Sequence, residues 1–121
     1  QLSFINYGHN EADGEITYQT EIEGLATQLL TAYPNTGVVL VTQNPQITPR
    51  TTLNIKAHAI RNSEIVVAAA KNNYGLVDAY RAFKETGSIS TYVSGDDGVH
   101  PLAAGSSLWA NEAVKFLLPA M

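Results

Sequence analysis

The sequence contains no cysteine, which excludes a disulfide framework and a thiol nucleophile but leaves the cellular compartment open. Basic residues are also few: seven Lys and Arg are scattered singly against eleven Asp and Glu, and the net charge is −4. A nucleic-acid-binding surface needs clustered basic side chains, so no nucleic-acid partner is expected. No apolar run approaches the roughly 18 residues of a membrane span. The remaining composition, 45% hydrophobic and 15% charged over 121 residues, is that of one globular domain.

The chain also lacks an initiator methionine and a signal peptide. It begins with Gln1 to Ile5, where a strand-like apolar pattern is already under way. On this ground we expect a chain cut by proteolysis, by processing or by the choice of cloning boundary.

Hydrophobic periodicity predicts alternating strands and helices. The clearest strand is Gly37 to Thr42, because its continuous Val-Val-Leu-Val run indicates burial on both faces. The full prediction comprises strands at Leu2–Tyr7, Gly37–Thr42 and Tyr74–Asp78, helices at Glu15–Tyr33, Thr51–Asn72, Ala79–Lys84 and Pro101–Leu117, and loops at Gln43–Arg50 and Gly87–Gly98.

The two long helices have predictable inward faces. In the first, helical spacing selects Tyr18, Ile22, Leu25, Ala26, Leu29, Leu30 and Tyr33. In the second, the face is less clean and comprises Leu53, Ala57, Ile60, Val67 and Ala68. Gly24 inside the first helix costs about 1 kcal/mol against alanine, which predicts close packing on a sheet. Pro101 suits the first position of the last helix, where its missing N–H costs nothing.

The order β-α-β-α-β-α predicts an α/β fold with a parallel sheet, right-handed crossovers and helices on the sheet faces. Three strands make a thin sheet. The first strand, Leu2–Tyr7, would normally need a neighbour on its other edge, and nothing in the chain supplies one.

Two polar clusters follow predicted strands, Gly8-His9-Asn10-Glu11 and Asp97-Gly98-Val99-His100-Pro101. The carboxyl ends of parallel strands share one rim of the sheet, where ligands bind, so the two clusters are expected to meet. The spacing lets the Asp97 carboxylate reach Nδ1 of His100, which fixes the ring tautomer and leaves Nε2 free to take a proton. The amide of Asn10 is a good oxyanion donor. Together these groups predict acyl-transfer machinery that lacks only its nucleophile.

Simpler interpretations stand beside this one. Asp97 can cap the turn before the last helix, His100 can be a packed residue, and Asn10 can be an ordinary turn residue. A metal site built from Asp96, Asp97, His100 and His9 is disfavoured, because hard ligands are few and their spacing matches no named site.

Three further residues have no predicted catalytic role. His58, in the middle of the second helix, is expected to be solvated or satisfied there. Trp109 is expected in the core or rim rather than in a sugar-stacking platform. Asp78, at a strand end, is expected to orient a loop.

The two polar clusters resemble conserved blocks of the SGNH hydrolases, also called the GDSL esterase and lipase family. Gly8-His9-Asn10-Glu11 is similar to the family's Gly-x-Asn-Asp block, and Asp97 to Pro101 is similar to its Asp-x-x-His-Pro block. The resemblance covers essentially the whole chain. It implies a three-layer α/β/α fold with a parallel, flavodoxin-like sheet. It also implies Asp97 and His100 as triad acid and base, Asn10 in the oxyanion hole, and Gly8 in the oxyanion and substrate loop.

The chain departs from the family pattern in two ways. Glu11 stands where the family usually has Asp, a conservative change. More seriously, the Gly-Asp-Ser nucleophile block and the second block, whose glycine donates to the oxyanion hole, are absent. The serines lie in neither context: Ser3, Ser63, Ser88, Ser90, Ser94, Ser106 and Ser107. Residues 1–121 are therefore interpreted as the C-terminal portion of one SGNH domain, with the N-terminal strands and the nucleophile segment missing.

By this resemblance the intact domain is a serine ester hydrolase that needs no metal or organic cofactor, and the isolated chain is expected to be inactive. The implied partners are an ester substrate (O-acetylated carbohydrate, short-chain ester or lipid acyl ester) and the missing N-terminal part of the domain. The resemblance also favours a secreted or extracellular setting. The alternative from another class is a non-catalytic, SGNH-like binding or structural module of a larger assembly.

Overall fold

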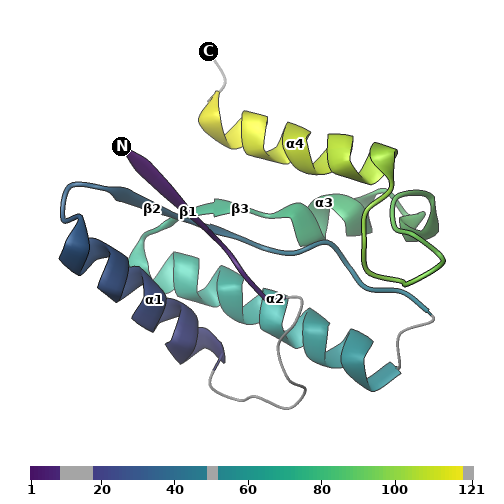
Figure 1. Ribbon diagram of the computed structural model, residues 1–121, viewed down its shortest axis with the longest axis horizontal. Helices are drawn as coiled ribbons and strands as arrows, with labels where there is room; N and C mark the ends of the chain where they lie inside the picture. Colours follow the sequence, from purple (N-terminus) through teal and green to yellow (C-terminus); the bar gives the residue numbers. More distant parts are fainter. Residues whose placement is uncertain (9–17, 49–51, 119–121) are drawn as a thin grey trace.

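A computed structural model describes residues 1–8, 18–48 and 52–118 of the chain. Strands and helices alternate through these ranges as the periodicity predicts, with small shifts at the element ends (Figure 1). The elements are β1 (Leu2–Asn6), α1 (Tyr18–Ala32), β2 (Gly37–Val41), α2 (Thr52–Asn72), β3 (Gly75–Val77), α3 (Ala79–Glu85), the 3-10 turn η1 (Ile89–Thr91) and α4 (Ala103–Leu117).

The three strands form one parallel sheet in the order β1-β2-β3. Asn6 pairs with Val41 and Val41 with Val77, so the three strands end side by side at one rim. The chain segments that leave this rim carry the predicted polar clusters. The parallel sheet expected from the sequence is therefore confirmed.

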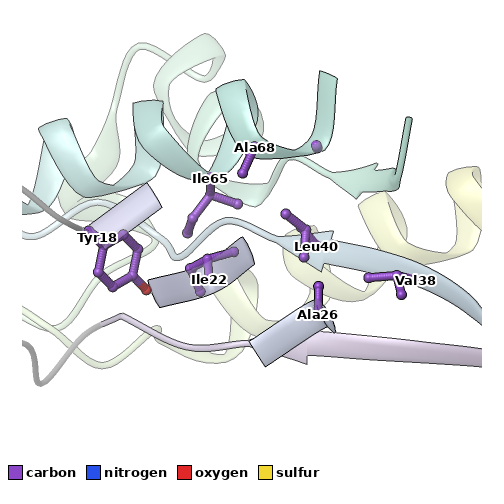
Figure 2. Packing of buried hydrophobic residues seen from close by; sticks show 8 residues of the cluster. Tyr18, Ile22, Ala26, Val38, Leu40, Ile65 and Ala68 are labelled. Atoms are coloured by element: carbon purple, nitrogen blue, oxygen red, sulfur yellow. The ribbon is translucent and has the colours of Figure 1, made fainter. Parts of the chain in front are cut away.

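The sheet is covered on both faces. In Figure 1, α1 and α2 lie on one side of the strands and α4 lies on the other. Alternation along β2 explains both contacts: Val38 and Leu40 pack under α1 and α2, whereas Val39 and Val41 pack under α4. Figure 2 shows the first cluster, in which Leu40 is completely buried. Burying one such side chain contributes about 1.5–3 kcal/mol. The three-layer α/β/α architecture is confirmed.

The inward face of α2 matches the predicted one at Ala68, which is fully buried, but differs from it at Ile60 and Val67. Ile60 and Val67 are half exposed, at 52% and 50%. The buried row contains His58, Asn62 and Ile65 instead. The prediction from apolar spacing fails here because the polar side chains of His58 and Asn62 point toward the sheet, where they hydrogen-bond to the loop that follows β2.

The packing of α1 also corrects expectations about this helix. A Cβ atom added to Gly24 would meet no neighbouring atom within 4 Å, so the prediction of close packing at this glycine is wrong. The sheet is contacted instead by the row that begins with Tyr18 and Ile22. Gly24 lies two residues, or roughly 200°, around the helix from Ile22 and therefore faces away. Leu25 and Tyr33 were also predicted on the inward face, and this is wrong: they are 40% and 63% exposed, and Tyr33 follows the helix end.

The last helix begins later than expected. α4 starts at Ala103 with Leu102 as its N-cap, and Pro101 forms an isolated antiparallel bridge with Val93. Leu102 N donates to Tyr92 O at 2.8 Å, which holds this segment extended beside the preceding loop. The segments on either side of the Asp97–His100 turn are thus paired with each other before the helix starts.

Within residues 1–8, 18–48 and 52–118, no helix combines the length and the hydropathy that a bilayer-spanning segment requires.

Candidate active site

The side chains of Asp97 and His100 are in direct contact. Asp97 Oδ2 lies 2.6 Å from His100 Nδ1. An ionised carboxylate oxygen only accepts, so Nδ1 donates the hydrogen, and in the neutral ring Nε2 carries the free lone pair. The His100 side chain is 80% exposed, and no residue in the described ranges hydrogen-bonds to its Nε2. The contact expected from the three-residue spacing is confirmed, whereas its catalytic role stays a prediction.

The second oxygen of Asp97 is held by the backbone. Asp97 Oδ1 accepts from the N–H of His100 at 3.0 Å and from that of Val99 at 2.8 Å. These two amides, followed by the hydrogen bond from the His100 side chain, hold the pKa of the Asp97 carboxyl well below its usual range. Asp97 is therefore anionic at neutral pH. It caps the turn and orients the imidazole at once, so the two interpretations drawn from the sequence are compatible.

Gly98 lets this turn lie against the loop after β2. Its φ is +71°, a left-handed conformation that residues with a Cβ rarely adopt. A Cβ at this position would overlap the carbonyl oxygen of Ile47. The Ile47 N–H donates to Gly98 O at 2.9 Å. Position 98 therefore requires glycine for two reasons, its left-handed backbone and the close approach of the Ile47 carbonyl.

The loop after β2 is buried and polar, and it joins the rim segments. Gln43 and Asn44 are 6% and 4% exposed. The Gln43 side-chain amide donates to Asn6 Oδ1 at the end of β1, and Asn44 Nδ2 donates to Val99 O at 2.8 Å. The loop after β2 therefore contacts both the end of β1 and the Asp97–His100 turn. Whether the two polar clusters meet stays a prediction, because residues 9–11 lie outside the described residues.

Gly8 follows β1 at this rim. It is buried, its φ is +138°, and a Cβ there would lie 2.6 Å from Tyr18 Oη. The same Tyr18 hydroxyl donates to Tyr7 O at 2.7 Å. This close approach accounts for the glycine. Asn10 lies in the range 9–17, outside the described residues, so the proposed oxyanion roles of Asn10 and Gly8 stay predictions.

Sequence reasoning missed a buried network on α2. His58 is 0% exposed and its Nε2 lies 2.9 Å from Asn44 O. Asn62 Oδ1 accepts from Gln43 N at 2.7 Å, and its Nδ2 donates to His58 O at 2.9 Å. Of the two outcomes left open for His58, the structure shows the satisfied, buried one. The signal was present: 58, 62, 65 and 69 follow helical spacing.

Asp78 and Trp109 behave as expected. Asp78 Oδ1 accepts from Arg81 N at 3.1 Å, which caps α3, and from Thr42 Oγ1 at 2.9 Å, which ties α3 to the loop after β2. Trp109 packs against the buried cluster of Val39, Val41 and Val77. In the part of the chain that the structure describes, no group of three or more His, Asp or Glu side chains could hold a metal ion.

No serine of the chain is placed to be activated by His100. All seven serines are described, and none of their hydroxyls hydrogen-bonds to the His100 ring. Ser3 lies toward the opposite end of β1, where its hydroxyl is 3.0 Å from Thr36 Oγ1. Ser94 Oγ accepts from Asp96 N at 3.2 Å.

Two cavities lie elsewhere among the described residues, one between α2 and the start of α3, and the other beside β3 at Leu76 and Val77. Their volumes are about 390 and 440 Å³, and both linings include Asp78 and Arg81. Neither lining contains Asp97 or His100.

Comparison with solved structures identifies the architecture. A member of the lipolytic G-D-S-L family from Veillonella parvula matches 80% of the chain with a TM-score of 0.61 and 21% identity. A lipase/acylhydrolase from Enterococcus faecalis matches 99% with a TM-score of 0.71 and 15% identity. The chain has the SGNH hydrolase fold. An acetylxylan esterase from Geobacillus stearothermophilus shares it, over 83% of the chain, with a TM-score of 0.63 and 21% identity.

The likeness is one of fold and covers only part of these proteins. The chain spans 52%, 63% and 47% of the three SGNH structures, in the order given. No protein-family model matches the sequence, and no curated protein matches it. The assignment of the Asp97–His100 pair therefore rests on its own contact geometry, in a fold that several esterases share.

Proposed function

We propose that this chain supplies the acid and the base of a serine ester hydrolase. The observation that carries the proposal is the 2.6 Å contact between Asp97 Oδ2 and His100 Nδ1, with Oδ1 of the same carboxylate fixed by two amides. Such a pair holds an imidazole in one tautomer and one orientation, which is what a general base for a hydroxyl nucleophile requires.

The proposed reaction proceeds in two halves. His100 Nε2 takes the proton of a serine hydroxyl while the serine oxygen bonds to the ester carbonyl carbon. The protonated ring then returns that proton to the leaving alcohol as the C–O bond breaks. Water repeats the sequence on the acyl-enzyme and releases the acid. Throughout, the anionic Asp97 accepts from Nδ1 and stabilises the imidazolium.

Asn10 is proposed to donate its side-chain amide to the tetrahedral oxyanion, with Gly8 in the same loop. The support is topological: Gly8 follows β1 at the rim reached by the Asp97–His100 turn. A donor of this kind lowers the barrier by about 3–4 kcal/mol in comparable sites.

The nucleophile is proposed to come from a segment outside residues 1–121. None of the seven serines bonds to His100. Moreover, β1 pairs only with β2 among the described strands, and its Leu2 and Phe4 side chains are 49% and 44% exposed. A further strand beside β1 would cover this apolar surface and carry a serine to the rim, so we propose that the remainder of the domain does both.

The proposed substrate is a carboxylic ester. O-acetylated carbohydrate is one class, because a structure with this fold is an acetylxylan esterase, and lipid acyl esters are another, because a second is a lipase/acylhydrolase. The second candidate function is a non-catalytic SGNH-like module, since a pair without a serine beside it is what such a module would also show. A Gly-Asp-Ser sequence after an upstream strand would favour the enzyme, and its absence the module.

The test is hydrolysis of p-nitrophenyl acetate by the intact protein, by His100→Ala and by Asn10→Ala. We expect turnover by the wild type, loss of almost all of it in His100→Ala, and a drop of about 10²–10³-fold in kcat in Asn10→Ala. Full activity in His100→Ala would refute the mechanism. An inactive wild-type protein would favour the non-catalytic module.

A further inference from the structure

Three carbonyl groups of the Asp97–His100 turn each accept a hydrogen bond from a different residue. Gly98 O accepts from Ile47 N at 2.9 Å, Val99 O from Asn44 Nδ2 at 2.8 Å, and His100 O from Ser94 N at 2.8 Å. Two of these three donors belong to the loop after β2. Of the three, Asn44 alone donates from its side chain, so its bond can be removed by substitution without altering the backbone.

Asn44 is itself held in place by α2. It is 4% exposed, and its carbonyl oxygen lies 2.9 Å from Nε2 of the fully buried His58. Asn62 Nδ2 lies 3.1 Å from the same nitrogen, so two groups contact Nε2. A carbonyl oxygen only accepts, so His58 donates to Asn44 O in the tautomer that carries the hydrogen on Nε2. Next to it, Asn62 Oδ1 accepts from Gln43 N. Gln43 and Asn44 are therefore both hydrogen-bonded to the same face of α2.

We propose that Asn44 is a positioning residue for the Asp97–His100 pair, and that His58 sets the position of Asn44, so that α2 fixes the geometry of the pair through the chain His58–Asn44–Val99. The proposal deepens the proposed ester hydrolase and rests on it for its kinetic consequence. Its structural consequence is independent of the reaction, because it concerns the Asp97–His100 contact alone.

Removing the Asn44 amide leaves Val99 O in a buried position without its donor. Val99 is 7% exposed, so the cost of the orphaned carbonyl is relieved only if the turn shifts or water enters. Either response moves the amides that hold Asp97 Oδ1. A misplacement of about 1 Å can lower kcat by roughly 10²-fold, and we expect a loss of that order in Asn44→Ala with a much smaller change in KM.

The experiment uses NMR on the intact protein and follows the Nδ1–H resonance of His100 with the Val99 and His100 amides. In Asn44→Ala the Nδ1–H signal should broaden or vanish, and the two amides should exchange about tenfold faster or more, an opening-energy change of about 1.4 kcal/mol. Thr42→Val is the matched control. Thr42 is equally buried in the same loop, but its hydroxyl bonds to Asp78 and to Tyr80 N, so it should lower stability and leave these resonances unchanged.

His58 provides a rescue arm. His58→Leu removes the donor to Asn44 O and should reproduce the loss seen in Asn44→Ala. His58→Gln places an amide N–H near the position of Nε2 and should restore most of the His100 signal and most of kcat. Equal behaviour of the Leu and Gln variants would overturn the role of His58.

The positioning role of Asn44 and the proposed ester hydrolase activity can be refuted independently. An unchanged Nδ1–H signal in Asn44→Ala, or an equal loss in Thr42→Val, overturns the positioning role whether or not the protein hydrolyses esters. A selective loss of the signal in a protein without esterase activity supports the positioning role and refutes the proposed function instead.

Discussion

Substituting Gly98 by alanine should destabilise the protein for two separable reasons. The left-handed backbone at φ +71° costs a residue with a Cβ about 1–2 kcal/mol. The added carbon would also overlap the Ile47 carbonyl, so the two loops must move apart and lose the Ile47 N–H to Gly98 O hydrogen bond, worth about 1 kcal/mol. The expected loss in the free energy of unfolding is about 2–3 kcal/mol.

Two other glycines separate the two causes. Gly87 has nearly the same φ, +69°, and a Cβ there would meet no atom within 4 Å. Gly87→Ala should therefore cost only the backbone term of about 1–2 kcal/mol. Gly95 has neither a left-handed φ nor a close neighbour, so Gly95→Ala should change stability by less than about 0.5 kcal/mol.

The assay is urea unfolding of the intact protein and the three variants, followed by circular dichroism. The difference between Gly98→Ala and Gly87→Ala isolates the contact with Ile47 and should be about 1 kcal/mol. Equal losses in these two variants would refute the packing of the Asp97–His100 turn against the loop after β2.

Three further predictions concern acid titration, the core and the isolated chain. Hydrogen bonds lower the pKa of Asp97 in the folded protein. The ionised Asp97 carboxylate therefore stabilises the fold above the unfolded pKa of about 3.9, and this stabilisation disappears as the pH falls through the lower folded pKa. In an NMR titration, the chemical shift of the Val99 amide should give a midpoint below 3.9. Leu40→Ala removes a fully buried side chain and should lower the unfolding free energy by about 2–5 kcal/mol, measured in urea. The isolated 121-residue chain should associate or precipitate because β1 pairs only with β2 among the described strands, and a sharp, reversible two-state melt of a monomer would contradict this.

The features predicted correctly from the sequence are those with local causes. The continuous apolar run at Val38–Val41 predicts a strand covered on both faces, and β2 is such a strand. The Asp97-x-x-His100 spacing predicts a contact because a turn of three residues brings the two side chains together, and the contact is present.

The features that sequence reasoning missed depend on tertiary partners. Apolar periodicity treats His58 and Asn62 as polar interruptions of a helix, yet both are buried because the loop after β2 offers them hydrogen-bond partners. Gly24 was expected against the sheet, but the phase of α1 is set by the row of Tyr18 and Ile22, which turns Gly24 away. Pro101 was expected in the helix, but a bridge to Val93 holds it outside.

The most direct test of the proposed acid–base pair compares two neighbouring aspartates. The wild-type protein, Asp97→Asn and Asp96→Asn would be assayed for ester hydrolysis at neutral pH. Asp97 accepts from the His100 ring, whereas Asp96 is exposed and its carboxylate has no hydrogen bond in the described residues. Asp97→Asn should lower kcat by about 10³–10⁴-fold, as loss of the triad acid does in other Ser-His-Asp enzymes, while Asp96→Asn should retain the wild-type rate. A wild-type rate in Asp97→Asn, or an equal loss in Asp96→Asn, would contradict the assignment of Asp97 and His100 as the acid and base of this site.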